Sequence, residues 1–231
     1  MNRPESNAKP KAIPEPSLRR LPIYYHLLQA MLAEGVTHIS TTGIAGPLQL
    51  DPTQVRKDLE AAGMIGKPKV GYSLEPLIRR IEEFLGWDQT KEAVLVGAGS
   101  LGTALLGYRR FRQFGFHLIA AFDTDPDKTG LTIAGTEVFP LERLAEFCSS
   151  RKIRLGVITT PPGTAQSVAI SLVDAGIRAI WNFAPVHLQV PPFVLLQNED
   201  LYRSLASLSY RLEQMLAAER ASVVLDPEPA H

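Results

Sequence analysis

The sequence is poor in cysteine and has no long apolar run. Its 231 residues include one cysteine, Cys148, which excludes an intramolecular disulfide and a cysteine-based metal cluster. Cys148 lies in a helical pattern, where we expect a buried thiol, with a redox-active thiol as the alternative. No apolar run approaches the ~20 residues that a membrane-spanning helix needs. We therefore expect a cytoplasmic protein with no membrane span and no metal site.

The sequence also lacks net charge, with 24 Lys and Arg against 24 Asp and Glu. Residues 1–86 carry 11 basic against 9 acidic side chains, and residues 87–231 carry 13 against 15. Because this imbalance is slight, a role in nucleic-acid binding must depend on where a few basic residues point. The apolar content of 45% fits a globular protein long enough for two small domains.

The N-terminal part predicts a leader followed by three helices. Residues 1–16 are rich in proline and polar side chains, which predicts a disordered leader. Apolar residues at helical spacing predict a first helix over 18–34. Ser40 or Thr41 is the expected N-cap of a short second helix, which glycine and proline weaken. An acidic N-cap followed by proline predicts a third helix over 51–62.

A basic hairpin and a fourth helix complete this part. Residues 66–73 contain proline and glycines and predict a hairpin, and a helix over 75–85 follows. The order of three helices, hairpin and helix predicts a winged-helix DNA-binding domain over residues 17–86.

Beyond a linker at residues 86–91, short apolar runs alternate with helical stretches. This alternation predicts an α/β domain over residues 87–199, with a Rossmann-like parallel sheet covered on both faces. The expected strands lie at 93–96, 117–122, 155–159 and 177–181.

A helix with an apolar seam is expected at the C-terminal end, over residues 200–220, before a disordered tail at 221–231. Its apolar residues recur at alternating spacings of four and three, which is typical of a helix that packs along a partner. We therefore expect a homodimer. The seam consists of Leu201, Leu205, Leu208, Leu212 and Met215.

A G-x-G-x-x-G motif, Gly97 to Gly102, lies between an apolar strand and a helical pattern. Gly97 allows a tight turn, Gly99 lets the backbone approach a pyrophosphate, and Gly102 lets the helix pack on the strand. Asp123 ends the next strand, where a carboxylate binds the adenosine ribose and disfavours NADP. NAD or NADH is therefore the expected ligand. A glycine turn without a nucleotide is the alternative.

Acid and base groups for hydride transfer are harder to find. His117 and His187 have no obvious carboxylate partner in sequence, and the chain has no room for a substrate domain. We therefore expect binding without catalysis. A small NAD-dependent oxidoreductase fused to a DNA-binding domain is the alternative.

The third helix has a polar and basic outer face if Val55 and Leu59 face the core. Such a face reads the major groove in helix-turn-helix proteins, although charges on an exposed helix often only contact solvent. Together with the basic hairpin and an arginine pair on the first helix, the predicted DNA-binding residues are Arg19, Arg20, Ser40, Gln54, Arg56, Lys57, Lys67, Lys69 and Tyr72.

Five segments, in order, resemble the Rex family of redox-sensing repressors, and the resemblance spans residues 13–216. The family has a winged helix, a Rossmann core and a C-terminal helix exchanged between subunits. The segments are Gln54-Val-Arg-Lys-Asp-Leu59, Val70-Gly-Tyr72, Val96-Gly-Ala-Gly-Ser-Leu-Gly102, Phe122-Asp-Thr-Asp-Pro126 and Asn182-Phe-Ala-Pro185.

The resemblance implies that NADH closes the dimer and releases operator DNA, whereas NAD binds less tightly and permits repression. It implies that Arg56 and Lys57 contact the operator, and that Phe183 lies near the nicotinamide. The full predicted cofactor set is Gly97, Ala98, Gly99, Ser100, Leu101, Gly102, Tyr108, Asp123, Thr160, Pro161 and Phe183.

The chain departs from the family where Glu60-Ala61-Ala62 replaces an aromatic pair and Lys67-Pro68-Lys69 replaces a glycine-rich wing. These departures put the operator preference in doubt. The family's switch also uses an arginine on the first helix, an acid before the C-terminal helix and a tyrosine on the first Rossmann helix. Asp200 and Tyr108 match, but His26 occupies the arginine position.

We therefore expect a coupling between NADH and DNA that is weaker, or that depends on pH through a His26–Asp200 pair. One alternative is that His26 only packs and Arg19 or Arg20 compensates. Another is a paralogue of the family that has lost DNA binding or the redox response.

Overall fold

The computed structural model describes residues 13–224, and the chain divides into two compact units. The first unit runs to Gln89 and also contains Gln113–Gly115, whereas the second contains Thr90–Arg112 and the chain from Phe116 onward. The predictions made for residues 1–12 and 225–231 lie outside the described residues.

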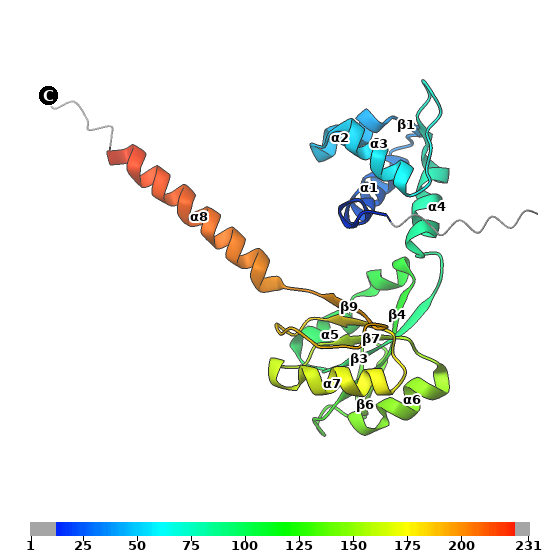
Figure 1. The fold of residues 1–231 in the computed structure, drawn as a ribbon, viewed down its shortest axis with the longest axis vertical. Coiled ribbons are helices and arrows are strands. Elements are labelled where there is room, and N and C mark those ends of the chain that lie inside the picture. Colours follow the sequence, from blue (N-terminus) through cyan, green and yellow to red (C-terminus); the bar gives the residue numbers. More distant parts are fainter. Residues whose placement is uncertain (1–12, 225–231) are drawn as a thin grey trace, which may run out of the picture. The chain divides into compact units, whose positions relative to one another are not determined.

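The first unit is a helical bundle with a two-stranded antiparallel sheet (Figure 1). The elements follow the expected order, and the sequence analysis missed only the short strand before the second helix. They are α1 (Glu15–Ala33), β1 (His38–Ile39), α2 (Thr41–Leu48), α3 (Pro52–Ala61), β2 (Tyr72–Ser73) and α4 (Leu74–Leu85).

Helix α2 forms although glycine and proline weaken its sequence. The Ser40 side chain accepts a hydrogen bond from the Gly43 backbone N–H at 3.0 Å, and Ile44 and Ala45 are buried. Asp51 caps α3 in the same way, accepting from the Thr53 N–H. Burial therefore offsets the poor helix propensity of α2, and side-chain caps fix where α2 and α3 begin.

Two predicted boundaries are wrong at the ends of the described chain. Helix α1 begins at Glu15, so residues 15 and 16 are helical and do not belong to a leader. Pro16 lies in the first turn, where its missing N–H costs nothing. Helix α8 (Leu201–Val224) extends beyond the expected end at residue 220.

The second unit contains a seven-stranded sheet in the order β5-β6-β4-β3-β7-β8-β9, in which only β5 is antiparallel to its neighbour. The predicted strands correspond to β3, β4, β7 and β8, whereas the other three were missed. The strands are β3 (Lys91–Val96), β4 (Phe116–Asp123), β5 (Thr132–Ile133), β6 (Thr136–Pro140), β7 (Leu155–Ile158), β8 (Ala179–Asn182) and β9 (Leu195–Asn198).

Helices cover both faces of this sheet (Figure 1). Val94 and Val96 of β3 share a core with α6 (Leu144–Arg151) and α7 (Pro162–Asp174), and Leu95 shares another with α5 (Ser100–Leu106). Successive side chains of β3 thus enter cores on opposite faces of the sheet. Because both faces are buried, the strand is apolar at consecutive positions. Two 3-10 helices, η1 (Arg109–Phe114) and η2 (Leu141–Arg143), connect these elements.

None of the helices in residues 13–224 combines the length and the apolar character of a membrane span. The one cysteine, Cys148, is buried on α6 at 1% exposure, and burial raises the pKa of its thiol to about 11. The expectation of a buried thiol is therefore confirmed.

Candidate dinucleotide cleft and DNA-binding face

A cleft of about 970 Å³ opens at the carboxyl ends of the strands of the second unit. Strand β3 lies between β4 and β7, so the loops that leave β3 and β7 run to opposite sides of the sheet. Ligands of open α/β sheets bind at such a switch point. The position and size of this cleft therefore suit a dinucleotide.

The glycine motif forms the loop between β3 and α5 at one wall of the cleft. Gly97 has a φ of +103°, and a Cβ on it would lie 2.9 Å from the carbonyl carbon of Thr159. A Cβ on Gly102 would collide with the carbonyl oxygen of Gly97. Gly99 lines the cleft, and a Cβ there would meet no atom of the described chain within 4 Å. Gly97 and Gly102 are thus needed for the fold, whereas Gly99 leaves space for a ligand.

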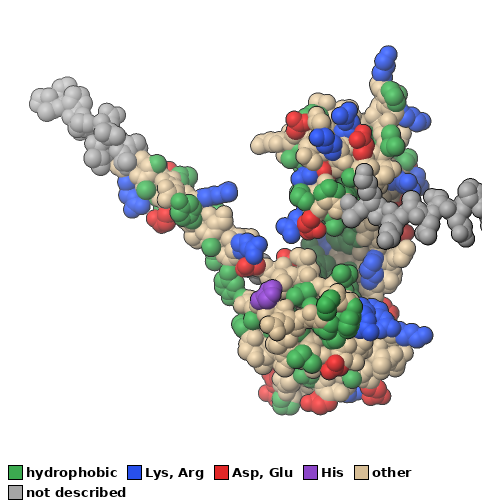
Figure 2. All heavy atoms as spheres, viewed as in Figure 1, with side chains coloured by type: hydrophobic (Ala, Val, Ile, Leu, Met, Phe, Trp, Pro, Cys, Tyr) green, Lys and Arg blue, Asp and Glu red, His purple; other side chains and the backbone are tan. Residues whose placement is uncertain are grey.

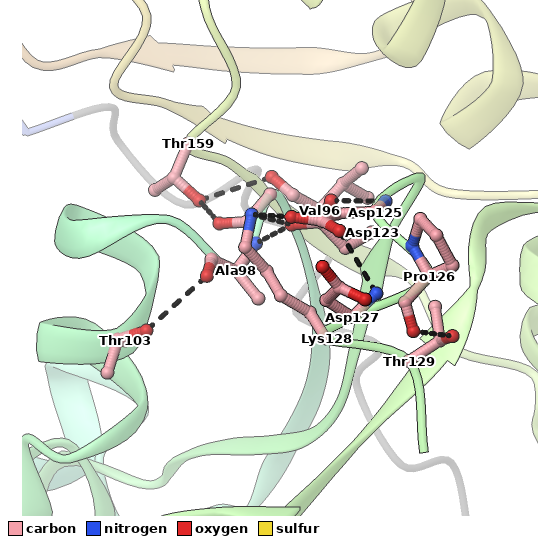
Figure 3. Close-up of polar contacts among 11 residues, drawn as sticks. Val96, Ala98, Thr103, Asp123, Asp125, Pro126, Asp127, Lys128, Thr129 and Thr159 are labelled. Atoms are coloured by element: carbon pink, nitrogen blue, oxygen red, sulfur yellow. Dashed lines mark hydrogen bonds and ion pairs between the residues drawn. The ribbon is translucent and has the colours of Figure 1, made fainter. Parts of the chain in front are cut away.

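Asp123 at the end of β4 holds this loop in place (Figure 3). Its Oδ2 accepts a hydrogen bond from the Ala98 N–H at 2.7 Å, and its Oδ1 accepts from the Asp125 N–H at 2.9 Å. The side chain is only 10% exposed. The carboxylate therefore has a structural role that the sequence analysis did not foresee, beside the predicted ribose contact.

Lys128 and Asp125 line the cleft beside Asp123, and the sequence analysis missed both. The Lys128 Nζ lies 3.4 Å from Asp123 Oδ2 and 3.2 Å from Asp125 Oδ2. A hydrogen bond from the Asp127 N–H, followed by that from Lys128, lowers the pKa of Asp125. The two carboxylates, Asp125 first, raise the pKa of Lys128. This end of the cleft therefore remains charged.

Two consecutive threonines after β7 differ in their hydrogen bonding. The Thr159 Oγ1 donates to the Gly97 carbonyl at 2.7 Å and also lies 3.1 Å from the Val96 carbonyl. The Thr160 Oγ1 is buried and has no hydrogen-bond partner within residues 13–224. Because Thr160 lines the cleft, a polar group of a bound ligand would satisfy this hydroxyl. The cleft residues therefore fit a dinucleotide.

The structure brings most of the predicted cofactor residues to the cleft. Ala98, Ser100 and Gly102 lie in the loop and the first turn of α5 without lining it. Tyr108 is an exception, because α5 ends at Leu106 and Tyr108 lies beyond it, lining a separate depression. Its predicted placement on the helix is wrong. The predicted residues that line the cleft are Gly97, Gly99, Leu101, Asp123, Thr160, Pro161 and Phe183.

The beginning of α8 also lines the cleft, which the sequence did not indicate. Tyr202 and Leu205 of α8 contribute, together with Glu199 before the helix. The Trp181 indole N–H donates to the Glu199 Oε1 at 2.9 Å, and the Trp181 ring lies 4.7 Å from that of Phe183. The segment that leads into α8 is therefore tied to the apolar wall of the cleft.

In the first unit, basic side chains surround α3 and the turn before β2 (Figure 2). Arg56 and Lys57 are exposed on α3, opposite the fully buried Val55 and Leu59. Lys67 and Lys69 are exposed in a tight turn in which the Lys67 and Gly71 backbones exchange hydrogen bonds. The predicted orientation of α3 and the predicted hairpin are confirmed.

Asp58 is the centre of a hydrogen-bond network that the sequence analysis missed. This fully buried carboxylate accepts from the Arg20 guanidinium at 2.6 and 2.8 Å, and from the Tyr24 hydroxyl at 2.6 Å. Burial alone would raise the pKa of Asp58, but these hydrogen bonds hold it at about 2. The ion pair fixes α3 against α1.

Several residues predicted to bind DNA also have structural contacts. Arg20 pairs with Asp58, and the Gln54 side-chain amide donates to the same carboxylate at 2.8 Å. Ser40 is the cap of α2. The Tyr72 ring is 8% exposed and packs against Gly66, so its expected place on the basic surface is wrong. Arg19 is exposed and pairs with Glu15.

The proposed switch residues lie on different units. His26 is exposed on α1, and its ring contacts the Tyr25 and Phe114 rings edge to face at 5.6 and 5.8 Å. Asp200 caps α8, where its Oδ1 accepts from the Arg203 N–H at 2.9 Å. A His26–Asp200 pair thus stays a prediction.

Helix α8 leaves large apolar side chains exposed along its length (Figure 2). Leu205, Leu208, Leu212 and Met215 of the predicted seam are between 46% and 65% exposed. Such a stripe is energetically unfavourable in water unless another surface covers it. The seam is consistent with a helix that packs against a partner.

Two family models match the chain, each over one part of it. Residues 88–186 match the model described as "CoA binding domain", which covers β3 to β8 of the second unit. Residues 12–60 match the model described as "Putative DNA-binding protein N-terminus", which covers α1 to α3.

Proteins described as the redox-sensing transcriptional repressor Rex are similar over most of the chain. The relative from Treponema denticola is 46% identical over 87% of this chain and 96% of its own length. That from Desulfitobacterium hafniense is 42% identical over 87% and 95%.

Solved structures of RSP, described as a Rex-family repressor, have the same fold. The structure of RSP with β-NAD+ and operator DNA superimposes with a TM-score of 0.85, at 35% identity over 95% of this chain and all of RSP. The structure of RSP with β-NADH gives 0.81, at 36% identity over 91% and 99%.

Proposed function

This chain belongs to the Rex family of redox-sensing transcriptional repressors, and we propose that it binds operator DNA and releases it when NADH binds. It acts as a cytoplasmic binding protein and not as an enzyme. Family membership weighs against the oxidoreductase alternative, for which His117 and His187 have no obvious carboxylate partner in sequence. The observation that carries the proposal is the cleft at the switch point of the sheet, with its glycine loop and the Thr160 hydroxyl, which has no hydrogen-bond partner within residues 13–224.

In this proposal the cleft binds NAD or NADH. Backbone N–H groups of the glycine loop and the N-terminus of α5 face the pyrophosphate, with Gly99 allowing its close approach. Asp123 and Asp125 form the ribose end and disfavour a 2′-phosphate. Phe183 and Pro161 provide apolar contacts for the nicotinamide end. The bound dinucleotide takes part in no reaction on the protein, and the signal is whether NAD or NADH occupies the cleft.

The DNA-binding role rests on the exposed face of α3. Arg56 and Lys57 are exposed and can reach a major groove, because Asp58 turns inward and fixes the helix through Arg20. The ion pair of Arg56 with Glu60, at 3.9 Å, also lies on the exposed face. The side chains of Lys67 and Lys69, which lie on the hairpin, contact phosphates of the DNA backbone. Arg20, Gln54 and Ser40 support this surface by positioning α3 and α2, and Arg19 adds a nearby positive charge.

Dimerisation through α8 links the two roles in this proposal. The exposed apolar stripe of α8 packs against a second copy, while Tyr202 and Leu205 at its beginning line the cleft. A ligand that contacts these residues therefore favours one position of α8 over another. His26, Tyr108 and Asp200 are the proposed switch residues.

Two binding assays on the full chain test the two roles separately. We expect calorimetric titration to give one NADH site per chain, and anisotropy to show binding of a DNA selected from random sequences. Lys57→Ala should weaken DNA binding about tenfold without changing NADH affinity. Arg79→Ala, which removes an exposed charge from α4 of the same unit, is the matched control. Equal DNA affinity of the two variants would contradict the assignment of α3.

A further inference from the structure

A second groove lies at the opposite end of the sheet from the dinucleotide cleft. Its volume is about 740 Å³, and residues at or just before the amino ends of β3, β7, β8 and β9 line it. Because the strands are parallel, these residues are a full strand length from the glycine loop. The groove is therefore a separate site, which the proposed function does not use.

Positive charge dominates the rim of this groove. Arg151, Lys152, Arg154 and Arg178 line it. None of these four has a carboxylate within 4 Å among the described residues, whereas Arg20 and Lys128, for example, each pair with one. Glu92 is the one acidic residue among those that line it. The rim is thus complementary to an anion.

Two of the arginines are held in place by contacts that leave most of their donors unused. The Arg154 Nη1 donates to the Gly176 carbonyl at 2.7 Å, and the Arg178 Nη1 donates to the Ile177 carbonyl at 3.0 Å. The Arg178 guanidinium also lies 5.1 Å from the centre of the Phe193 ring. A guanidinium has five N–H donors, so each arginine retains several for a ligand. Such preorganisation lowers the entropic cost of binding.

The floor of the groove is apolar. Ile153, Leu155 and Ala179 form it, and Leu195 of the edge strand β9 extends it at 76% exposure. An inorganic anion would gain nothing from this surface, whereas an apolar group that covers Leu195 would be stabilised by the apolar area that it removes from water.

We propose that this groove binds a small organic anion, in which a carboxylate or phosphate monoester is joined to an apolar group. The anionic group pairs with Arg154 and Arg178, and the apolar group lies on Leu155 and Leu195. The binding involves no covalent step. It gives the protein a second ligand besides the dinucleotide.

The probe is 8-anilinonaphthalene-1-sulfonate, an anion with an apolar body that fluoresces when it leaves water. The probe is titrated into the full chain in the presence of excess NAD, because bound NAD prevents the probe from binding in the dinucleotide cleft. Octanoate is then added to displace the probe from the groove. We expect the double variant Arg154→Ala/Arg178→Ala to lose at least tenfold in affinity for the displaceable probe. Leu195→Gln should weaken binding severalfold. Thermal unfolding confirms that each variant is folded.

Arg143→Ala is the matched control, because Arg143 also lies over an aromatic ring, that of Phe139 at 4.9 Å, but does not line the groove. It should bind the probe like the parent chain. An unchanged affinity of the double variant would overturn the proposal. Inorganic phosphate that displaces the probe as well as octanoate would reduce the site to an adventitious ion site only. An acidic peptide that outcompetes octanoate would replace the small ligand with a protein partner.

Discussion

The carboxylate of Asp58 accepts two hydrogen bonds from the guanidinium of Arg20, at 2.6 and 2.8 Å, inside the DNA-binding unit. Asp58 is two residues from Arg56 on α3, and Arg20 lies on α1. The pair therefore connects the helix that faces DNA to the helix that supports it. Gln54 and Tyr24 complete the network and fully satisfy the buried carboxylate.

We expect Asp58→Asn to lower the free energy of unfolding by about 3 kcal/mol, because it leaves the Arg20 guanidinium without its charged partner. Urea unfolding followed by circular dichroism measures this loss. Asp51→Asn on the same helix is the control, because asparagine caps a helix as well as aspartate does, and it should change stability by less than about 0.5 kcal/mol. Equal effects of the two variants would show that the ion pair is not important.

The same variant gives a pH dependence with a definite sign. The pKa of Asp58 is about 2 in the folded protein, below its ordinary value of 3.8. The folded state thus gains about 2 kcal/mol from this group above pH 4, and the gain is lost as pH falls toward 2. The stability difference between the parent chain and Asp58→Asn should therefore shrink between pH 5 and pH 2.5. A constant difference would contradict the assigned pKa.

Thr160→Val should weaken NADH binding about tenfold without destabilising the protein, because its buried hydroxyl has no partner within the described chain. Thr159→Val should behave in the opposite way. It loses the hydrogen bond to the Gly97 carbonyl, so unfolding should become easier by about 1 kcal/mol. Calorimetry with NADH and thermal unfolding separate the two effects. A loss of stability in Thr160→Val would mean that its hydroxyl has a structural partner.

Gly99→Ala should fold normally, because a Cβ at this position meets no described atom within 4 Å. It should lose at least tenfold in NADH affinity, because the added methyl group would occupy the space through which the pyrophosphate approaches the backbone. Gly102→Ala should instead destabilise the protein, because its Cβ collides with the Gly97 carbonyl. Gly46→Ala, which also meets no described atom within 4 Å, is the control: it should leave NADH affinity unchanged and should not destabilise the protein, because alanine favours a helix such as α2 more than glycine does. Unchanged NADH affinity in Gly99→Ala would place the pyrophosphate elsewhere.

His26→Arg introduces the residue that the resemblance to the family implies at this position, and we expect it to strengthen the effect of NADH on operator binding. If His26 pairs with Asp200, release by NADH in the parent chain should vary between pH 6 and pH 8.5, and His26→Arg should abolish that variation. Operator anisotropy over this pH range is the measurement. Release that is constant with pH and unchanged in His26→Ala would reduce His26 to a packing role against Phe114.

The elements that the sequence predicts well are those with local signals. The helix α3 has an acidic cap, a proline in its first turn and the buried pair Val55 and Leu59, and the glycine loop lies between an apolar strand and a helix. Strand β9 was missed because the apolar run that enters it follows directly on Pro191 and Pro192 and gives way to Gln197 and Asn198 within the strand. At the edge of the sheet only Leu196 of the four residues of β9 is even partly buried, whereas four residues of the central strand β3 are buried.

Residues whose role depends on distant partners were not predictable. Asp58 looks like one more charge on a polar helix, and only its contact with Arg20, 38 residues earlier, shows that it is buried. Thr159 and Thr160 are neighbouring threonines that the sequence does not distinguish. Only the geometry of the loop shows that Thr159 bonds to the Gly97 carbonyl, whereas the Thr160 hydroxyl has no partner within the described residues. Tyr72 looked like a hairpin residue for DNA, but its ring fills space over Gly66.

Fluorescence anisotropy of a labelled operator decides whether the redox switch operates in this chain. The full-length protein is held on DNA at one fixed salt concentration, because phosphate contacts make the affinity depend on ionic strength. NADH and NAD are then titrated in separate experiments. We predict that NADH releases the DNA at concentrations at which NAD does not. Tight DNA binding that is indifferent to both nucleotides would contradict a redox sensor and would leave a repressor without its switch.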